Sequence, residues 1–277
     1  MKKKSAHTTP TAMLLTVLLM LGSATAPAQV VDGERIVKAS MLAERRDYSK
    51  PFYVGIQFDL SSGWYLYWIN PGDSGLPIEV TWELPEGYEA GPILYPVPQK
   101  YGSSESIAYG FKRQLLLLCE IRPTGRSRIV GTPSIKVSLD WLVCKESCLR
   151  GSTEVILDLN RLSPSQEMTE DLLRRAKARL PRSSSSLHGT VDIPEIVRDG
   201  QMERVTLRFS GNERIRIKDF YPEPIDDYTI EHSSISVSNN QVTIPLMAQT
   251  QHSTLKRIRG LLITEGDAYQ LDIPVVE

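Results

Sequence analysis

Short runs in which apolar and polar residues alternate recur along most of this chain. Tyr53–Leu60 (YVGIQFDL) and Ile78–Leu84 (IEVTWEL) alternate in this way, as half-buried strands do. The aromatic run Trp64–Ile69 (WYLYWI) ends at Asn70–Asp73 (NPGD), whose residue types favour a turn. Further strands are predicted at Gln114–Ile121, Ser134–Val143 and Thr153–Leu159. Short strands with turns between them and no interleaved helices predict an antiparallel β-sandwich.

Strand patterns resume in the last third of the chain, from Leu187 to Glu277. The predicted strands there are Arg204–Phe209, Arg214–Ile217, Ser234–Val237, Gln241–Leu246, Arg259–Ile263 and Tyr269–Val275. A segment of roughly 90 residues suits a second small sandwich. The predicted fold class is therefore all-β, with two sandwich domains.

The segment between the two groups of strands has a helical pattern. Ser163 can cap a helix, Pro164 suits the first helical position, and Gln166 completes a capping box. The helix is expected to end before Pro181, and Arg182–Ser186 (RSSSS) reads as a flexible linker. The predicted domains are thus residues 29–162 and 187–277, joined by a helix and linker at 163–186.

The N-terminus has the pattern of an export signal. Three lysines, Lys2 to Lys4, precede the apolar run Ala12–Leu21 (AMLLTVLLML), which is too short to span a bilayer. Cleavage is expected after Ala28, with Ala26 as the alternative position. No later apolar run approaches 18 residues. The mature chain is therefore predicted to lie outside the cytoplasm and not to span the membrane itself.

Charge and histidine spacing narrow the classes of partner. Loss of the three signal-peptide lysines takes the formal net charge from −1 to −4, which argues against nucleic acid or an anionic membrane. His188, His232 and His252 are scattered with no ligand spacing, so they are interpreted as surface or loop residues and no metal site is expected.

The three cysteines divide into a close pair and a single residue. Cys144 and Cys148 lie in Asp140–Gly151 (DWLVCKESCLRG), whereas Cys119 falls within the strand pattern QLLLLCEIR. A free cysteine in such a run is most simply an inert core thiol. In an oxidising compartment the other two are candidates for a disulfide.

The spacing of Cys144 and Cys148 restricts how they can pair. Residues four apart on one extended strand lie about 13 Å apart, far beyond the Cα separation of a disulfide, so pairing requires a turn at Lys145–Ser147. A bridge that closes so short a loop adds little stability, which favours a disulfide that opens and closes. A fixed structural bridge and a Cu(I) site made of two thiolates stay open as alternatives. Lys145 would stabilise a neighbouring thiolate, and Glu146 would oppose it.

Four segments together resemble a known family. They are Trp64–Pro77 (WYLYWINPGDSGLP), Val80–Gly87 (VTWELPEG), Tyr95–Pro98 (YPVP) and Trp141–Cys148 (WLVCKESC). Over about residues 33–160 the chain resembles the N-terminal periplasmic domain of the DsbD family of thiol:disulfide interchange proteins, including relatives linked to suppression of copper sensitivity. Residues 187–277 resemble, in outline, the second sandwich of longer relatives.

The resemblance implies an immunoglobulin-like fold and a protein-disulfide reductase activity with no cofactor. Cys144 and Cys148 would be the redox-active pair, with Cys148 attacking the client and Cys144 resolving the mixed disulfide. In the family, a membrane-embedded electron carrier feeds a thioredoxin-like domain that reduces this pair. The pair then reduces clients such as disulfide isomerases or the thioredoxins of cytochrome c maturation.

The resemblance also implies an aromatic shield over the pair. The nearest match is Gln99–Gly102 (QKYG), with Tyr101 as the shield and Tyr109 as its rival, and Trp141 is expected beside the pair. Two features depart from the family pattern. Arg150 stands where many relatives have a proline, and the sequence ends at Glu277 without a membrane domain, so the electron carrier is expected to be a separate polypeptide.

Overall fold

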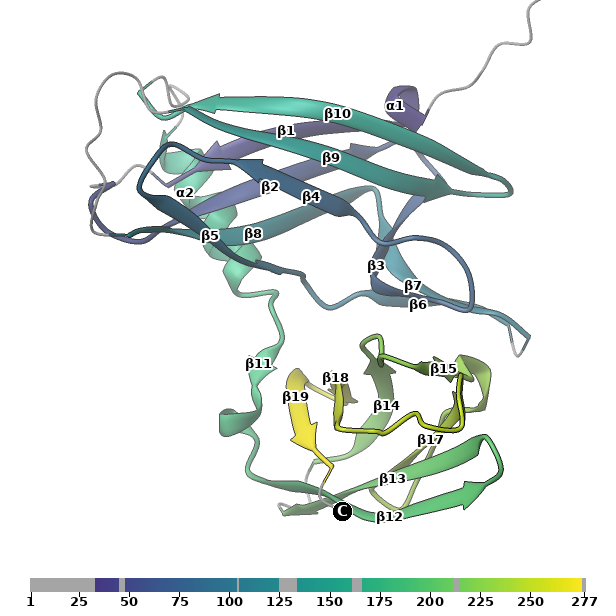
Figure 1. Cartoon of the computed structure of the whole chain (residues 1–277). Helices are drawn as coiled ribbons and strands as arrows, with labels where there is room; N and C mark the ends of the chain where they lie inside the picture. The colour runs from purple at the N-terminus through teal and green to yellow at the C-terminus, as the bar shows by residue number, and fades with distance from the viewer. Residues whose placement is uncertain are drawn as a thin grey trace, which may run out of the picture. The chain divides into compact units, whose positions relative to one another are not determined.

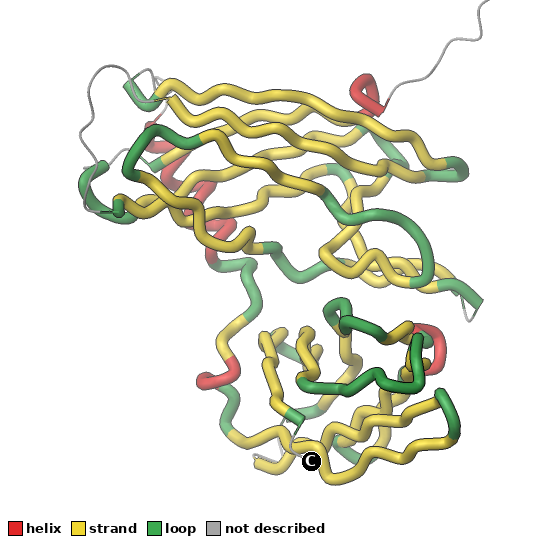
Figure 2. The backbone as a smooth tube through the Cα atoms, in the orientation of Figure 1, coloured by secondary structure: helices red, strands yellow, loops and turns green. Residues whose placement is uncertain are grey.

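The computed structural model describes residues 33–44, 48–103, 105–124, 134–160, 166–211 and 215–275, without the side chains of residues 166 and 194 (Figures 1 and 2). The predicted signal peptide and the predicted helix cap at Ser163 lie outside these residues. No helix in the described ranges is long and apolar enough to cross a membrane.

Residues 33–160 form the first sandwich, which is built almost wholly of strands (Figure 1). Its elements are α1 (Gly33–Ile36), β1 (Val37–Ala43), β2 (Phe52–Leu60), β3 (Tyr65–Gly72), β4 (Glu79–Glu83), β5 (Tyr88–Leu94), β6 (Gln99–Gly102), β7 (Ile107–Lys112), β8 (Gln114–Pro123), β9 (Ser134–Cys144) and β10 (Cys148–Asp158). One sheet has the order β1-β2-β8-β5. The other has the order β10-β9-β3-β7-β6, and β4 also pairs with β9.

The core of the first sandwich lies between these two antiparallel sheets. Phe58 and Leu117 from one sheet pack with Leu66, Leu139 and Trp141 from the other, and all five are buried. In β9 every second residue from Ile135 to Val143 faces this core, because side chains alternate along a strand. The alternation of apolar and polar residues in this half of the chain therefore arises because each sheet has one face buried against the core.

The second sandwich follows the same principle. Its elements are β11 (Arg182–Ser183), η1 (Ser184–Ser186), β12 (Gly189–Asp199), β13 (Met202–Gly211), β14 (Ile217–Pro222), β15 (Tyr228–Ile230), η2 (His232–Ser234), β16 (Ser236–Ser238), β17 (Gln241–Ala248), β18 (Arg257–Thr264) and β19 (Ala268–Pro274). The sheet orders are β11-β19-β18-β14 and β12-β13-β17-β15, and β16 also pairs with β17. The predicted all-β fold class, with two sandwiches, is confirmed.

The predicted connecting helix is present as α2 (Gln166–Lys177). Leu173 and Ala176 pack on Leu118 of β8, so the helix covers the outer face of one sheet of the first sandwich. Lys177 donates to the carboxylate of the buried Glu44 at 2.7 Å and lies over the ring of Tyr53. The helix is thus fixed to the first sandwich by apolar packing and by a partly buried ion pair.

Several details differ from the sequence predictions. Arg182–Ser186 is not a free linker, because Arg182 and Ser183 pair with Tyr269 and Gln270 of β19 and the serines continue as a 3-10 turn. Of the strand predicted at 214–217, Arg214 lies outside the described residues, and β14 begins at Ile217. The strand predicted at 234–237 is divided between η2 and β16. Both predicted segments alternate polar and apolar residues but are only four residues long, and over so short a run tertiary pairing decides where a strand begins.

His232 also departs from its predicted surface position. The side chain is buried, with its ring 5.4 Å from that of Tyr109, and burial lowers its pKa. His188 and His252 are exposed, as predicted. Within the described ranges no group of three histidine, cysteine or acidic residues could hold a metal ion.

Candidate functional site

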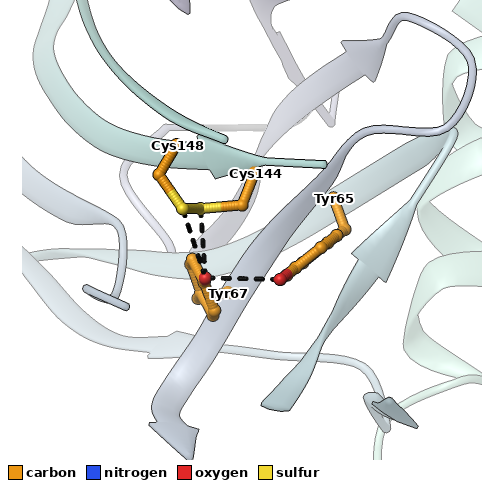
Figure 3. The surroundings of a disulfide bond; sticks show 4 residues. All are labelled: Tyr65, Tyr67, Cys144 and Cys148. Atoms are coloured by element: carbon orange, nitrogen blue, oxygen red, sulfur yellow. Dashed lines mark hydrogen bonds between the residues drawn. A yellow bond between two sulfur atoms is a disulfide. The ribbon is translucent and has the colours of Figure 1, made fainter. Parts of the chain in front are cut away.

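Cys144 and Cys148 form a disulfide at the tip of the β9–β10 hairpin (Figure 3). The two residues face each other in the antiparallel register, with their Cα atoms 4.2 Å apart. The backbone N–H of Lys145 donates to the carbonyl of Ser147 at 3.0 Å, which closes the three-residue turn. The turn predicted at Lys145–Ser147 is therefore confirmed, and it brings the two sulfurs together.

The two cysteines differ in exposure. Cys144 ends β9 opposite Tyr65 of β3 and is only 2% exposed, whereas Cys148 begins the edge strand β10 and is exposed. A central strand buries its side chains under both neighbours, and an edge strand leaves one side open. A second protein can therefore reach Cys148 more readily than Cys144.

Tyr67 contacts both sulfurs from the neighbouring strand (Figure 3). Its hydroxyl donates to Sγ of Cys144 at 3.1 Å and lies 3.9 Å from Sγ of Cys148. The hydroxyl of Tyr65 lies 3.4 Å from that of Tyr67. A tyrosine hydroxyl has one proton to donate, so when Tyr67 donates to sulfur it accepts from Tyr65. The two tyrosines then form a short chain of hydrogen bonds that ends on Cys144.

The positions of these two tyrosines follow from strand geometry. Tyr65 pairs with Cys144 across β3 and β9, and residues two apart on a strand point to the same face. Tyr67 therefore shares that face with Tyr65, while Leu66 points into the core. Burial, and next the hydrogen bond with Tyr65, raise the pKa of Tyr67, so its hydroxyl stays a proton donor at neutral pH.

The loop after β3 covers the ring of Tyr67. Gly75 has a φ of 110°, and a Cβ at this position would collide with the Tyr67 ring. Glycine adopts this conformation without steric cost and lets the loop backbone approach the ring closely. Asp73 fastens the same loop, because its carboxylate accepts from the N–H of Ile107 at 2.6 Å. The sequence NPGDSG therefore helps to hold Tyr67 against the disulfide.

Tyr101, the predicted shield, lies beside this tyrosine pair. Its ring centroid is 5.5 Å from that of Tyr65, and its hydroxyl donates to Oε1 of Gln99 at 2.6 Å. Nζ of Lys112 lies 4.1 Å from the centroid of the same ring. Tyr65 thus lies between Tyr101 and Tyr67, the residue that contacts sulfur. A shielding role for Tyr101 stays a prediction.

Tyr109 and Trp141 instead belong to one buried apolar cluster, against which Tyr221 also packs. Tyr109 is fully buried, with its ring 6.1 Å from Trp68 and 4.8 Å from Tyr221. Trp141 packs on Phe58 and points to the opposite face of β9 from Cys144, since three positions separate them. Both rings therefore support the sheet behind the disulfide and do not cover the sulfurs from the same side.

The remaining predicted neighbours lie in the turn itself. Lys145 and Glu146 are exposed, and the Lys145 side chain runs close to the backbone of Gly63. The third cysteine, Cys119, is buried in β8 as predicted, and its Sγ donates to the carbonyl of Gly91 at 3.3 Å. Burial raises the pKa of the Cys119 thiol to about 11.

Sequence reasoning did not select Tyr65 and Tyr67 as site residues. Both lie in the run WYLYWI, and their spacing of two already placed them on one face of a strand. The sequence carries no signal that this strand would lie beside the cysteines, which are 77 and 81 positions from Tyr67.

An antiparallel sandwich with a disulfide at a hairpin tip, one sulfur buried and one exposed, has the features expected of a thiol–disulfide exchange domain. Residues 33–160 match the model of the family described as thiol:disulfide interchange protein DsbD, N-terminal. The resemblance predicted from the sequence is therefore confirmed over the same residues. No curated protein matches the chain.

The fold is also similar to that of a solved structure, the N-terminal periplasmic domain of ScsB from Proteus mirabilis. The TM-score is 0.67 at 14% identity, over 87% of this chain and 94% of that chain. The periplasmic chaperone SfaE and the E. coli chaperone DraB align at TM-scores of 0.24 and 0.22 with 8% and 9% identity. Those alignments cover 84% and 87% of this chain and 97% and 100% of the chaperones, and their scores are too low to support an argument.

Proposed function

We propose that this protein is a periplasmic protein-disulfide reductase that relays electrons through Cys144 and Cys148. The observation that carries the proposal is the asymmetry of the pair, with Cys148 exposed and Cys144 buried under the Tyr67 hydroxyl. An attacking cysteine must reach its target in another protein, whereas a resolving cysteine needs to reach only its own neighbour.

The exchange has two steps. The Cys148 thiolate attacks a client disulfide, forming a mixed disulfide and releasing one client thiolate. The Cys144 thiolate then attacks Sγ of Cys148, which forms the Cys144–Cys148 bond and releases the second client thiolate. The client gains two electrons and, on protonation, two protons, and this protein is left oxidised.

The proposed partners follow from the compartment and the family. The predicted export signal, together with the periplasmic origin of the similar ScsB domain, supports a periplasmic location. Thioredoxin-like proteins and disulfide isomerases are the proposed clients, in cytochrome c biogenesis or copper tolerance. A separate membrane electron carrier of the DsbD type is the proposed electron source.

Trapping of the mixed disulfide tests this proposal. Cys144→Ala leaves Cys148 without its resolving partner, so it is expected to accumulate mixed disulfides with periplasmic proteins. Cys148→Ala is the matched variant and is expected to trap none, and both are made in a Cys119→Ala background to remove the third thiol. Adducts with Cys148→Ala alone would reverse the proposed order of attack, and adducts with neither variant would refute the relay.

Reduction potential and metal content separate the relay from its two alternatives. A potential below about −300 mV is typical of structural disulfides and would contradict a reversible bridge. Stoichiometric Cu(I) that protects both thiols after anaerobic purification would instead favour copper binding by the two thiolates.

A further inference from the structure

A groove of about 500 Å³ lies between α2 and the first sandwich. We call it the α2 groove. Its floor and helix wall are apolar and come from β7, β8 and α2, namely from Phe111, Leu116, Leu172 and Ala176. The groove is open at the surface, beside the segment that leads into β6.

The rim of the α2 groove is positively charged. Lys112, Arg175 and Arg179 line it, and no carboxylate does. Arg175 pairs with Asp171 at 2.7 Å, but Asp171 lies outside the lining and also pairs with Arg174. One carboxylate therefore serves two guanidinium groups, and the groove keeps a surplus of positive charge over an apolar floor. This combination is complementary to an acidic ligand that carries an apolar group.

Two lining residues of the α2 groove also hold Tyr101. Gln99 accepts the hydrogen bond of the Tyr101 hydroxyl at 2.6 Å, and Lys112 lies over the Tyr101 ring at 4.1 Å. Tyr101 in turn packs on Tyr65, which is hydrogen-bonded to the tyrosine that contacts Cys144. A carboxylate bound in the groove would compete with Tyr101 for Lys112, because one ammonium group would serve both.

We propose that the α2 groove docks an acidic segment with an apolar side chain, belonging to the protein that exchanges thiols with Cys144 and Cys148, and that docking loosens Tyr101. This rests on the proposed relay for the identity of the partner. A segment of that protein fits because the groove reaches the strands beside the disulfide: Lys112 pairs with Tyr65 of β3, and Tyr65 pairs with Cys144 of β9. The groove also shares Lys112 and Gln99 with the contacts of Tyr101.

Binding is tested with a short peptide and the full mature protein. The probe is acetyl-Asp-Leu-Glu-Leu-amide, and its control is the isosteric acetyl-Asn-Leu-Gln-Leu-amide. In an NMR titration we expect the acidic peptide to shift the backbone amides of Gly110, Lys112 and Ala176 and to leave that of Gly200, in the second sandwich, unchanged. Equal shifts with the neutral peptide would overturn the charge complementarity on which the proposal depends.

Two charge variants of the helix segment provide the matched comparison. The double variant Arg175→Gln, Arg179→Gln removes two groove cations. It is expected to lower the affinity for the acidic peptide about tenfold, which is the effect of losing two exposed ion pairs. Arg174→Gln lies on the same helix and shares Asp171 but is not in the groove, so it should leave the affinity unchanged. Equal loss in both variants would show a general charge effect and refute the site.

The effect of groove binding on the disulfide is measured separately, as the rate of disulfide reduction. Saturating acidic peptide is expected to speed reduction of Cys144–Cys148 by dithiothreitol about threefold, the effect of losing one exposed cation–π contact. The double Arg175→Gln, Arg179→Gln variant should show no acceleration at the same peptide concentration. Peptide that shifts the groove amides without changing the rate would refute the loosening of Tyr101.

The same titration distinguishes a protein segment from other classes of ligand. Octanoate, a fatty carboxylate, is titrated in parallel, and shifts with octanoate but not with the peptide would overturn the assignment to a protein segment. Dithiothreitol replaces the client in the rate measurement, so these results do not depend on the trapping experiment. If the peptide binds but neither cysteine variant traps a client, the α2 groove is supported as a binding site and the relay is refuted.

Discussion

The hydroxyl of Tyr67 points at Sγ of Cys144 from a distance of 3.1 Å, across two neighbouring strands. Burial raises the pKa of this tyrosine, so the group next to the buried sulfur is a proton donor over the whole neutral range. Once the disulfide is reduced, the same hydroxyl is placed to donate to the Cys144 thiolate. The environment of the resolving sulfur therefore depends on a residue from a distant part of the chain.

Tyr67→Phe should raise the pKa of the Cys144 thiol. A hydrogen bond donated to a charged group is worth about 1.5–3 kcal/mol, so we expect a rise of at least about one pH unit when it is removed. The pKa is measured by the ultraviolet absorbance of the thiolate against pH, in a Cys148→Ala, Cys119→Ala background that isolates Cys144. Tyr95→Phe removes the hydroxyl of a partly buried tyrosine that stacks on Phe111 and should have no effect. An unchanged pKa in Tyr67→Phe would show that the hydroxyl does not stabilise the thiolate.

Cys119 should stay unreactive in the folded protein. With a thiol pKa of about 11, only about one molecule in ten thousand carries the thiolate at pH 7, and the side chain is fully buried. After mild reduction we expect iodoacetamide to label two thiols in the native protein and a third only after unfolding, as counted by mass spectrometry. Native labelling of Cys119 at the rate of Cys148 would contradict this.

Gly151→Ala should destabilise the first sandwich behind the hairpin. A Cβ at Gly151 would lie 2.6 Å from Nε1 of the buried Trp141, against rigid backbone at Gly33 on the other side. Overpacking of this kind costs about 1–3 kcal/mol of unfolding free energy. The free energy is measured by chemical denaturation of the oxidised protein. Gly266→Ala is the control, because its added Cβ meets nothing within 4 Å, and a similar loss in both variants would refute the packing argument.

Lys177→Met should loosen α2 from the first sandwich. Methionine keeps most of the apolar stem but removes the ammonium group that binds Glu44, whose side chain is about 10% exposed. Breaking a fully buried pair costs several kcal/mol; since Lys177 is 35% exposed, we expect about 1–2 kcal/mol. The free energy of unfolding is again measured by chemical denaturation, which is monitored through a probe on α2. Arg174→Met, at a position 76% exposed on the same helix, should change little, and an equal effect there would contradict the role of the pair.

Much of the fold could be predicted from local patterns. The longer strands, such as β2 and β9, were predicted to within one residue at each end because their alternation marks a half-buried sheet. Short segments such as β6, β15 and β16 have too few residues to show a period. The pairing of Arg182 and Ser183 with β19 was missed for a related reason, since serine-rich composition resembles that of a linker.

The sequence by itself determined the all-β class, the turn between the two cysteines, and the burial of Cys119. Each depends on residues close together in the chain, where spacing alone limits the geometry. Only the tertiary structure decided that Tyr67 faces the sulfurs and that Trp141 and Tyr109 lie in the core. Those positions depend on which strands become neighbours, and packing across the whole sandwich sets that pairing and its register.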